Sequence, residues 1–165
     1  MIVWIEKPLA LAIHERQLSE HGGSTGVRDE KLLESALARP QGLYASLHVK
    51  AAIPGRTSQK SHAYDDPAPD IADLAASLAY GLARNHPFVD GNKRTAHVCY
   101  RVFLALNDVE FDANDEDKYI AMMSLAEGSL KEKQFTAWLR QHMKLKPGKR
   151  VQEPRAKKHH ARAGS

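Results

Sequence analysis

The sequence contains little cysteine and no long apolar run. Cys99 is the only cysteine among the 165 residues, so no disulfide can form within the chain, and its apolar surroundings predict a buried thiol. No stretch approaches the about 18 consecutive apolar residues that would indicate a membrane-spanning helix. The apolar residues 1–5 are too few for a secretory signal and are soon followed by charges. These absences predict a globular domain in the cytoplasm without a membrane partner.

A broad excess of one charge sign is also missing from most of the chain. The net charge is +4, but residues 144–165 hold eight lysines and arginines against one glutamate and carry +7. Residues 1–143 therefore carry −3, and we expect no specific nucleic-acid partner for this body. Because the basic stretch lacks apolar periodicity, we predict a folded domain over 1–143 and a disordered tail over 144–165.

Apolar residues recur at helical spacing in several segments, which predicts a compact all-α bundle of about six helices. The clearest pattern begins at Pro69 or Asp70 and leads into a second helix over 92–107, and these two should form the hydrophobic centre. Earlier helices are predicted up to the Gly22-Gly23 break and from Asp29 to Arg39, where Pro40 should end the helix. Two later helices are predicted over about 115–126, with Tyr119, Ile120 and Met123 as apolar residues, and over about 131–143.

Two stretches between these helices are irregular. Residues 22–26 are rich in glycine but lack the ending of a P-loop, so we interpret them as a plain connector. Residues 41–68 show little periodicity and contain turn signals such as Pro54-Gly55. A connection of this length inside a compact domain is typical of a functional flap, and we predict that it holds the backbone of a target protein beside the site.

The segment between the two central helices is the richest in chemical groups: His86-Pro87-Phe88-Val89-Asp90-Gly91-Asn92-Lys93-Arg94. Its Asp-Gly-Asn indicates a tight turn, because glycine accepts backbone angles that other residues resist. The turn leads into a helix N-terminus, where unpaired N–H groups and the helix dipole attract anions. Two cations in the first helical turn oppose that dipole, which suggests that an anionic ligand compensates.

These residue types suit the handling of a phosphate group. His86 is the candidate base and Asp90 the candidate Mg²⁺ ligand, since imidazole titrates near neutrality and a hard cation prefers carboxylate oxygens. The other assignments follow by residue type: Gly91 for close approach of the phosphates, Asn92 as helix cap and phosphate contact, Lys93 and Arg94 as phosphate clamps, and Phe88 as a wedge in the core. The plainer alternatives are a capping histidine, a turn-forming aspartate and two solvated cations.

The same segment resembles the signature of the Fic superfamily, H-P-F-x-[D/E]-G-N-x-R. Within that superfamily it is most similar to the Doc (death-on-curing) toxin branch, whose version reads H-x-F-x-D-x-N-K-R-T-A. The resemblance extends to Gly22–Asp29 and Leu33–Gln41 on one side and to Ala126–Gly128 and Trp138-Leu139 on the other. It covers roughly residues 8–143 and leaves out the tail.

The resemblance to Doc implies a toxin that phosphorylates a Ser or Thr hydroxyl, with ATP as co-substrate and Mg²⁺ as cofactor. It implies translation elongation factor Tu as the protein substrate, arrest of translation and growth as the outcome, and a Phd-like antitoxin as partner. It also gives Arg84 a role in phosphate binding, although a cation at a helix C-terminus is already explained by the dipole. Residues 123–128 do not match the self-inhibiting [S/T]-x-x-x-E-[G/N] motif of some Fic proteins, which fits a separate antitoxin.

Two alternative functions remain open at this point. In AMP-transferring relatives a Gly commonly stands where this chain has Lys93 and a second Arg where it has His97, and these differences favour phosphoryl transfer. An AMP- or other nucleotidyl-transferase that uses the same His86 and Asp90 is the first alternative. The second is a non-catalytic binding module, which the basic tail would tether to nucleic acid or membrane.

Overall fold

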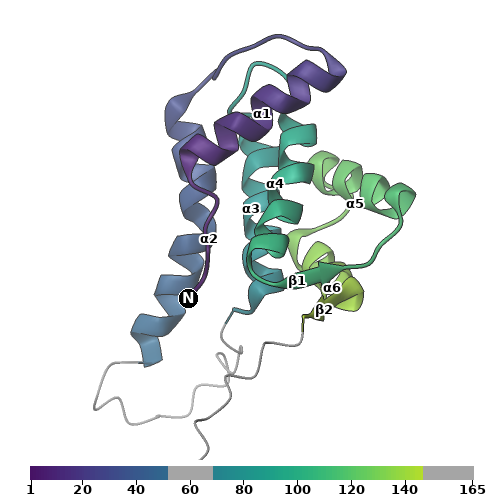
Figure 1. Cartoon of the computed structure of the whole chain (residues 1–165). Helices are drawn as coiled ribbons and strands as arrows, with labels where there is room; N and C mark the ends of the chain where they lie inside the picture. Colours follow the sequence, from purple (N-terminus) through teal and green to yellow (C-terminus); the bar gives the residue numbers. More distant parts are fainter. Residues whose placement is uncertain (52–68, 147–165) are drawn as a thin grey trace, which may run out of the picture.

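The computed structural model describes residues 1–51 and 69–146, and for residues 47–51 the backbone only. This part of the chain contains six helices and one small sheet, which confirms the predicted all-α class. In chain order the elements are α1 Lys7–His21, α2 Glu30–Ala51, α3 Ile71–Asn85, α4 Asn92–Leu106, β1 Val109–Phe111, α5 Asp115–Glu127, α6 Glu132–His142 and β2 Met143–Leu145 (Figure 1).

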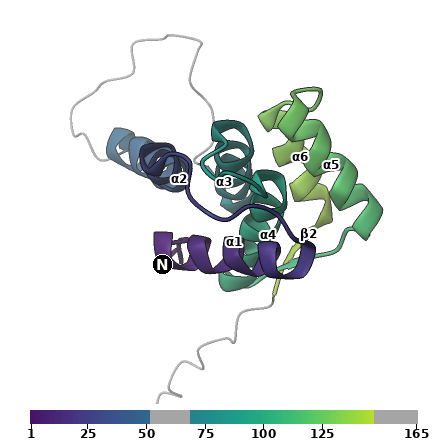
Figure 2. The same ribbon diagram turned by 90° about the horizontal axis from the view of Figure 1, so that it is seen from above.

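Helices α3 and α4 form the centre of the molecule, as their periodicity predicted. Both bury long apolar side chains along one face, including Leu78 and Leu82 of α3 and Phe103 of α4, all at most 1% exposed. Helix α2 packs on α3 and α1 on α4, while α5 and α6 cover the opposite side (Figure 2). The free thiol of Cys99 is buried in this core, as expected from its position.

Helix α2 continues through Pro40, which corrects the prediction that it ends there. A proline inside a helix removes one hydrogen bond and costs roughly 3 kcal/mol. Packing against α3 offsets this loss: the backbone of Ala36 approaches Gly81 so closely that a Cβ on Gly81 would lie 3.2 Å from the Ala36 Cα. Leu43, beyond the proline, also packs against the core. Residues 41–51 of the predicted flap are therefore helical, and residues 52–68 lie outside the described part.

The large apolar residues named for the predicted helix over 115–126 do not form the buried face of α5. Tyr119 and Ile120 are 63% and 52% exposed, whereas the buried stripe consists of Ala121, Met122, Leu125 and Ala126. Two of these four residues are alanines, which give a weak hydrophobic signal but allow close packing on the neighbouring helices. The helix is therefore rotated by about one residue relative to the face that its largest apolar side chains suggested.

A short antiparallel sheet closes the fold beside α4. β1 pairs with β2 in the register Val109↔Leu145, and the backbone N–H of Lys146 donates to the carbonyl of Asp108 at 2.9 Å. The first residues of the predicted tail, Lys144 and Leu145, are thus part of a strand, and residues 147–165 lie outside the described part. None of the helices in the described ranges has both the length and the apolar character needed to cross a bilayer.

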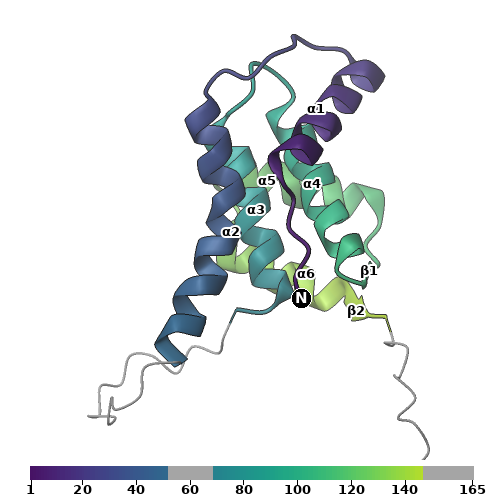
Figure 3. The same ribbon diagram turned by 60° about the vertical axis from the view of Figure 1, so that its left-hand side comes forward.

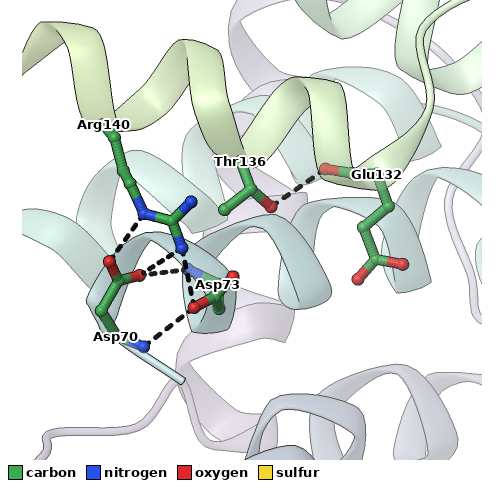
Figure 4. A network of polar contacts seen from close by, with 5 residues as sticks. All are labelled: Asp70, Asp73, Glu132, Thr136 and Arg140. Atoms are coloured by element: carbon green, nitrogen blue, oxygen red, sulfur yellow. Dashed lines mark hydrogen bonds and ion pairs between the residues drawn. The ribbon is translucent and has the colours of Figure 1, made fainter. Parts of the chain in front are cut away.

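A network of polar contacts ties α6 to the start of α3 (Figure 4). Asp70 caps α3 by accepting from the Asp73 N–H at 3.0 Å, and the Asp73 carboxylate accepts from the Asp70 N–H at 2.9 Å. Arg140 of α6 donates to both oxygens of Asp70, at 2.7 and 3.2 Å, and also contacts the Asp73 carboxylate at 2.9 Å. Such a capping box with a forked cation fixes where α3 begins.

Candidate active site

His86 ends α3 in a backbone conformation that is unusual for a residue with a side chain. Its φ and ψ are 47° and 54°, in the left-handed region that bulky residues rarely adopt. The side chain is exposed. The chain thus presents an imidazole to solvent at the carboxyl end of a central helix, in a strained conformation of the kind that clusters at functional sites.

A short antiparallel pairing holds the turn after His86 against the loop between α1 and α2. Val27 and Phe88 form an isolated β-bridge, and the Val89 N–H donates to the carbonyl of Gly26 at 3.0 Å. Figures 1 and 3 show the loop and the turn at the same end of the molecule. The loop was interpreted as a plain connector; it joins α1 to α2, and in addition it forms one wall of the turn.

Phe88 anchors the turn in the core, as predicted. It is 1% exposed, and its ring stacks on that of His14 in α1 with centroids 3.8 Å apart and planes 8° apart. His14 is itself buried and hydrogen-bonds through Nε2 to the backbone oxygen of Asp90 at 2.8 Å, so this nitrogen carries the hydrogen. The buried imidazole of His14 therefore supports both the ring of Phe88 and the backbone of Asp90, the candidate metal ligand.

The side chain of Asn92 closes the turn rather than capping α4, which corrects its predicted capping role. Its Oδ1 accepts from the Phe88 N–H at 2.9 Å and its Nδ2 donates to the Phe88 carbonyl at 3.0 Å. The N-cap position belongs instead to Gly91, whose φ of 76° is the left-handed value that favours glycine. The contact of Asn92 with a phosphate stays a prediction.

The carboxylate of Asp90 is held by backbone donors on both oxygens. Oδ1 accepts from the Gly91 N–H at 2.7 Å and Oδ2 from the Ser24 N–H at 3.2 Å. These bonds, the one from Gly91 first, hold the pKa of Asp90 below its usual range, with a smaller contribution from the charge of Arg94. Gly23 leaves the room for this arrangement, since a Cβ there would lie 2.6 Å from the Asp90 Oδ2.

The first turn of α4 combines cations with an uncapped helix end. Lys93 is exposed, and the described residues give its ammonium group no partner. Arg94 donates to the carbonyl of Gly22 at 3.0 Å and lies 4.0 Å from the Asp90 carboxylate. In the described part no side chain caps the amino end of α4, and its first intrahelical bond is from the Thr95 N–H to the Gly91 carbonyl. The preceding N–H groups therefore face the turn as an anion site would require.

The side chains of the turn suit Mg²⁺ better than a metal ion that is coordinated by protein ligands alone. Within residues 1–51 and 69–146, no group of three or more His, Cys, Asp or Glu side chains is placed to hold a metal ion. Asp90 would thus provide a single ionised carboxylate. Mg²⁺ usually keeps several waters and binds through one or two carboxylates together with substrate phosphates, so a lone carboxylate beside a phosphate site suits it.

Comparison with known proteins assigns the chain to a family. The model of the Fic/DOC family matches residues 4–104. This chain belongs to the Fic/Doc family. The protein named Toxin Doc of Mycolicibacterium smegmatis is 38% identical over 104 residues, which are 62% of this chain and 66% of that protein. The protein named Protein kinase doc of Escherichia phage P1 is 28% identical over 104 residues, 62% of this chain and 68% of that protein.

Arg84 is placed apart from the other site residues of this Fic/Doc chain. Its Nη1 donates to the carbonyl of Ala126 near the carboxyl end of α5, at 3.1 Å, next to Gly128. A cation that satisfies the last carbonyls of a helix is a common C-terminal arrangement. The structure therefore gives Arg84 a role in attaching α5, and phosphate binding by it stays a prediction.

Residues outside the motif complete the site, and sequence reasoning missed them. His14, Ser24 and Arg28 all contact the turn, but they lie more than fifty residues away in the chain. The resemblance over Gly22–Asp29 could have pointed to Ser24 and Arg28, but it had no chemical interpretation; no comparable signal marked His14. Their roles depend on the bridge between the α1–α2 loop and the turn, and no local pattern encodes that pairing.

The cavity that the fold forms near this site does not contain the candidate base. It has a volume of about 450 Å³ and lies between α1 and the loop, where His14, Leu18 and Gly23 are among its lining residues. His86 and Lys93 are not among the lining residues. The candidate base and Lys93 therefore lie outside this cavity.

Proposed function

We propose that this Fic/Doc family member is a Doc-type toxin that transfers the γ-phosphoryl group of ATP to a Ser or Thr hydroxyl of a cytoplasmic protein. The turn itself carries the proposal: it holds an exposed imidazole, a carboxylate biased towards its ionised form and an uncapped helix start with two cations. The names of the two relatives, a toxin and a protein kinase, support the same activity for this chain.

Each group in the turn has a role in the proposed reaction. His86 accepts the proton of the attacking hydroxyl, and Lys93, Arg94 and the first N–H groups of α4 bind the oxygens of the transferred group. Asp90 would hold Mg²⁺, which when bound neutralises charge on the phosphates. Gly91 lets the backbone approach those phosphates, because it has no side chain to stand between them and the helix end.

The state of His97 favours phosphoryl over nucleotidyl transfer. This residue stands where nucleotidyl-transferring members of the resembled superfamily carry a second arginine. Burial, helped by the charges of Arg101 and Lys118, lowers the pKa of His97 to about 4. An uncharged imidazole at neutral pH does not replace the arginine that would grip the distal phosphates in the AMP-transferring pose.

A nucleotidyl-transferase is the second candidate function, because Pro87 and Gly91 match positions that the wider Fic signature fixes and the Doc version leaves open. Both functions would use His86 as base and Asp90 as metal ligand. They differ in which phosphorus of ATP reaches the protein hydroxyl.

Family resemblance also suggests the partners. Translation elongation factor Tu is the proposed substrate, and its modification would arrest translation and growth. A Phd-like antitoxin would restrain the toxin, which accords with the name of the Mycolicibacterium relative. A binding module without catalysis would need neither ATP nor His86, so the experiment below separates it from both enzymes.

The test is label transfer from ATP. The purified chain is incubated with Mg²⁺, purified elongation factor Tu or a bacterial cytosolic extract, and ATP labelled on either the α- or the γ-phosphorus. We expect γ-label in protein, and none with His86→Ala. Transfer of α-label would establish the nucleotidyl-transferase instead. No transfer of either label, together with growth arrest by His86→Ala, would leave only the binding module.

A further inference from the structure

The carboxyl end of α3 is held by a residue that lies outside the signature. A helix ends with carbonyl groups that have no partner within the helix. Arg28 binds three consecutive carbonyls here: its Nη2 donates to Asn85 at 3.0 Å, its Nε to His86 at 2.8 Å and its backbone N–H to Pro87 at 2.8 Å.

These three bonds surround the strained residue. The left-handed conformation of His86 is disfavoured for a residue with a side chain, so it persists only where neighbouring contacts determine the backbone on both sides. Arg28 binds the carbonyl of His86 and the carbonyls of the residues directly before and after it. The direction in which the side chain leaves the backbone follows from the backbone angles of residue 86, and the three bonds of Arg28 lie on both sides of these angles.

Arg28 can do this because its own backbone is fixed. It lies between the bridge at Val27 and the start of α2, where the Asp29 side chain accepts from the Leu32 N–H at 3.0 Å. The Asp29 N–H also donates to the Pro87 carbonyl at 3.1 Å. The guanidinium group therefore extends from an anchored backbone, and its planar fork reaches two carbonyls that a lysine, as a point charge, would not bind together.

We propose that Arg28 is the positioning residue of the candidate base: it orients His86 by fixing its backbone and does not touch the substrate. This inference rests on the proposed function, in which His86 is the base. General-base catalysis depends on hydrogen-bond geometry at the hydroxyl, and a displacement of about 1 Å can reduce a rate on the order of 100-fold. Loss of Arg28 should therefore lower the transfer rate while leaving the binding of ATP nearly unchanged.

The experiment measures initial rates of label transfer from γ-labelled ATP, with Mg²⁺, to protein in a bacterial cytosolic extract. Arg28→Ala should reduce kcat roughly 30-fold and Arg28→Lys roughly 10-fold, with the KM for ATP within about 3-fold of the parent value. Arg16→Ala is the matched control, since Arg16 is an exposed arginine whose side chain pairs with Glu20 on α1 and does not contact the turn. It should leave both constants unchanged.

Chemical rescue separates positioning from general stabilisation. Guanidinium ion at about 20 mM, far below the molar concentrations that unfold proteins, should restore several-fold of the activity of Arg28→Ala. It should not restore His86→Ala. If Arg28→Ala fails to fold, the Arg28→Lys variant decides through the split between kcat and KM.

The two proposals fail in different ways. If His86→Ala still transfers label, the proposed base is wrong, whatever Arg28 does. If His86→Ala is inactive but the folded Arg28 variants retain the parent kcat, the positioning role is wrong and the proposed function stands. The same conclusion follows if the two Arg28 variants lose activity only through a raised KM for ATP.

Discussion

Helix α3 begins and ends in opposite ways. At its start, Asp70 has an ordinary extended backbone, its capping box is complete, and Arg140 binds both of its oxygens (Figure 4). At its end, His86 has a left-handed backbone and an exposed ring, and its carbonyl depends on Arg28 from a distant loop. Both ends are held by an arginine from a distant segment, but the first has an ordinary extended backbone, whereas the second has a left-handed backbone and presents an exposed imidazole. The comparison predicts that the start of α3 serves stability and that its end serves the proposed function.

The most severe test of this separation is His86→Asn. Asparagine adopts the left-handed region more readily than other residues, so the backbone should remain intact while the base is lost. We expect label transfer to fall by about 10²–10⁴-fold, the range of general acid–base catalysis, and the thermal midpoint to stay the same or rise. A large drop in thermal stability would show that the imidazole supports the fold, and the two ends would then be alike.

The next largest effect is expected for Asp90→Asn. The amide oxygen can still accept from the Gly91 N–H, and only the longer bond from the Ser24 N–H loses its acceptor, so the turn should persist. The charge that would hold Mg²⁺ is lost. Transfer at a fixed Mg²⁺ concentration should fall on the order of 100-fold, and a titration should show that more Mg²⁺ is needed for half of the maximal rate. An unchanged Mg²⁺ dependence would remove Asp90 from the metal site.

The opposite end should respond in stability alone. Asp70→Ala removes an N-cap and the main partner of Arg140, and loss of a cap costs about 1 kcal/mol. The ion pair is half exposed and adds little, so the thermal midpoint should fall by roughly 2–4 °C, with kcat per folded molecule unchanged. Asp112→Ala is the control, because Asp112 is exposed and its side chain has no partner in the described residues. A lower kcat in Asp70→Ala alone would mean that strain is transmitted along α3.

The same division explains how much could be predicted from sequence. The central helices, the start of α3 near Asp70 and the buried Phe88 follow from local periodicity and turn chemistry, and all were predicted. The course of α2 beyond Pro40 was not, because close packing of Ala36 on Gly81 overrides a local helix breaker. The residues that hold the turn in place, such as His14 and Arg28, were missed because they too depend on packing between distant segments.

Those supports are set by contacts between distant segments. His14 stacks on Phe88, and Arg28 binds the carbonyl of His86, only because the α1–α2 loop forms a bridge with the turn. Sequence patterns state which groups a segment carries, and in this chain they located the candidate chemistry. The partners that orient each group come from tertiary pairing, which a pattern of one segment does not contain.

The smallest expected effect concerns His97, one helical turn beyond Arg94, and it tests the electrostatics near the candidate site. With a folded pKa of about 4 against an unfolded value of 6.5, this residue binds fewer protons in the folded chain between those two pH values. The free energy of unfolding therefore falls as pH falls through this window, and the loss is complete below the folded pKa. His97→Gln removes the contribution of this residue.

Because His97 is partly exposed, we expect the parent chain to lose about 1 kcal/mol more than His97→Gln between pH 7 and pH 4.5, rather than the larger value that the full pKa shift would imply. Urea unfolding of both proteins at the two pH values measures this difference, and any other titrating group cancels in the comparison. Equal losses would mean that the imidazole titrates as freely in the folded chain as in the unfolded one. It would then be available to carry charge near the phosphates, and the argument against nucleotidyl transfer would lose its electrostatic support.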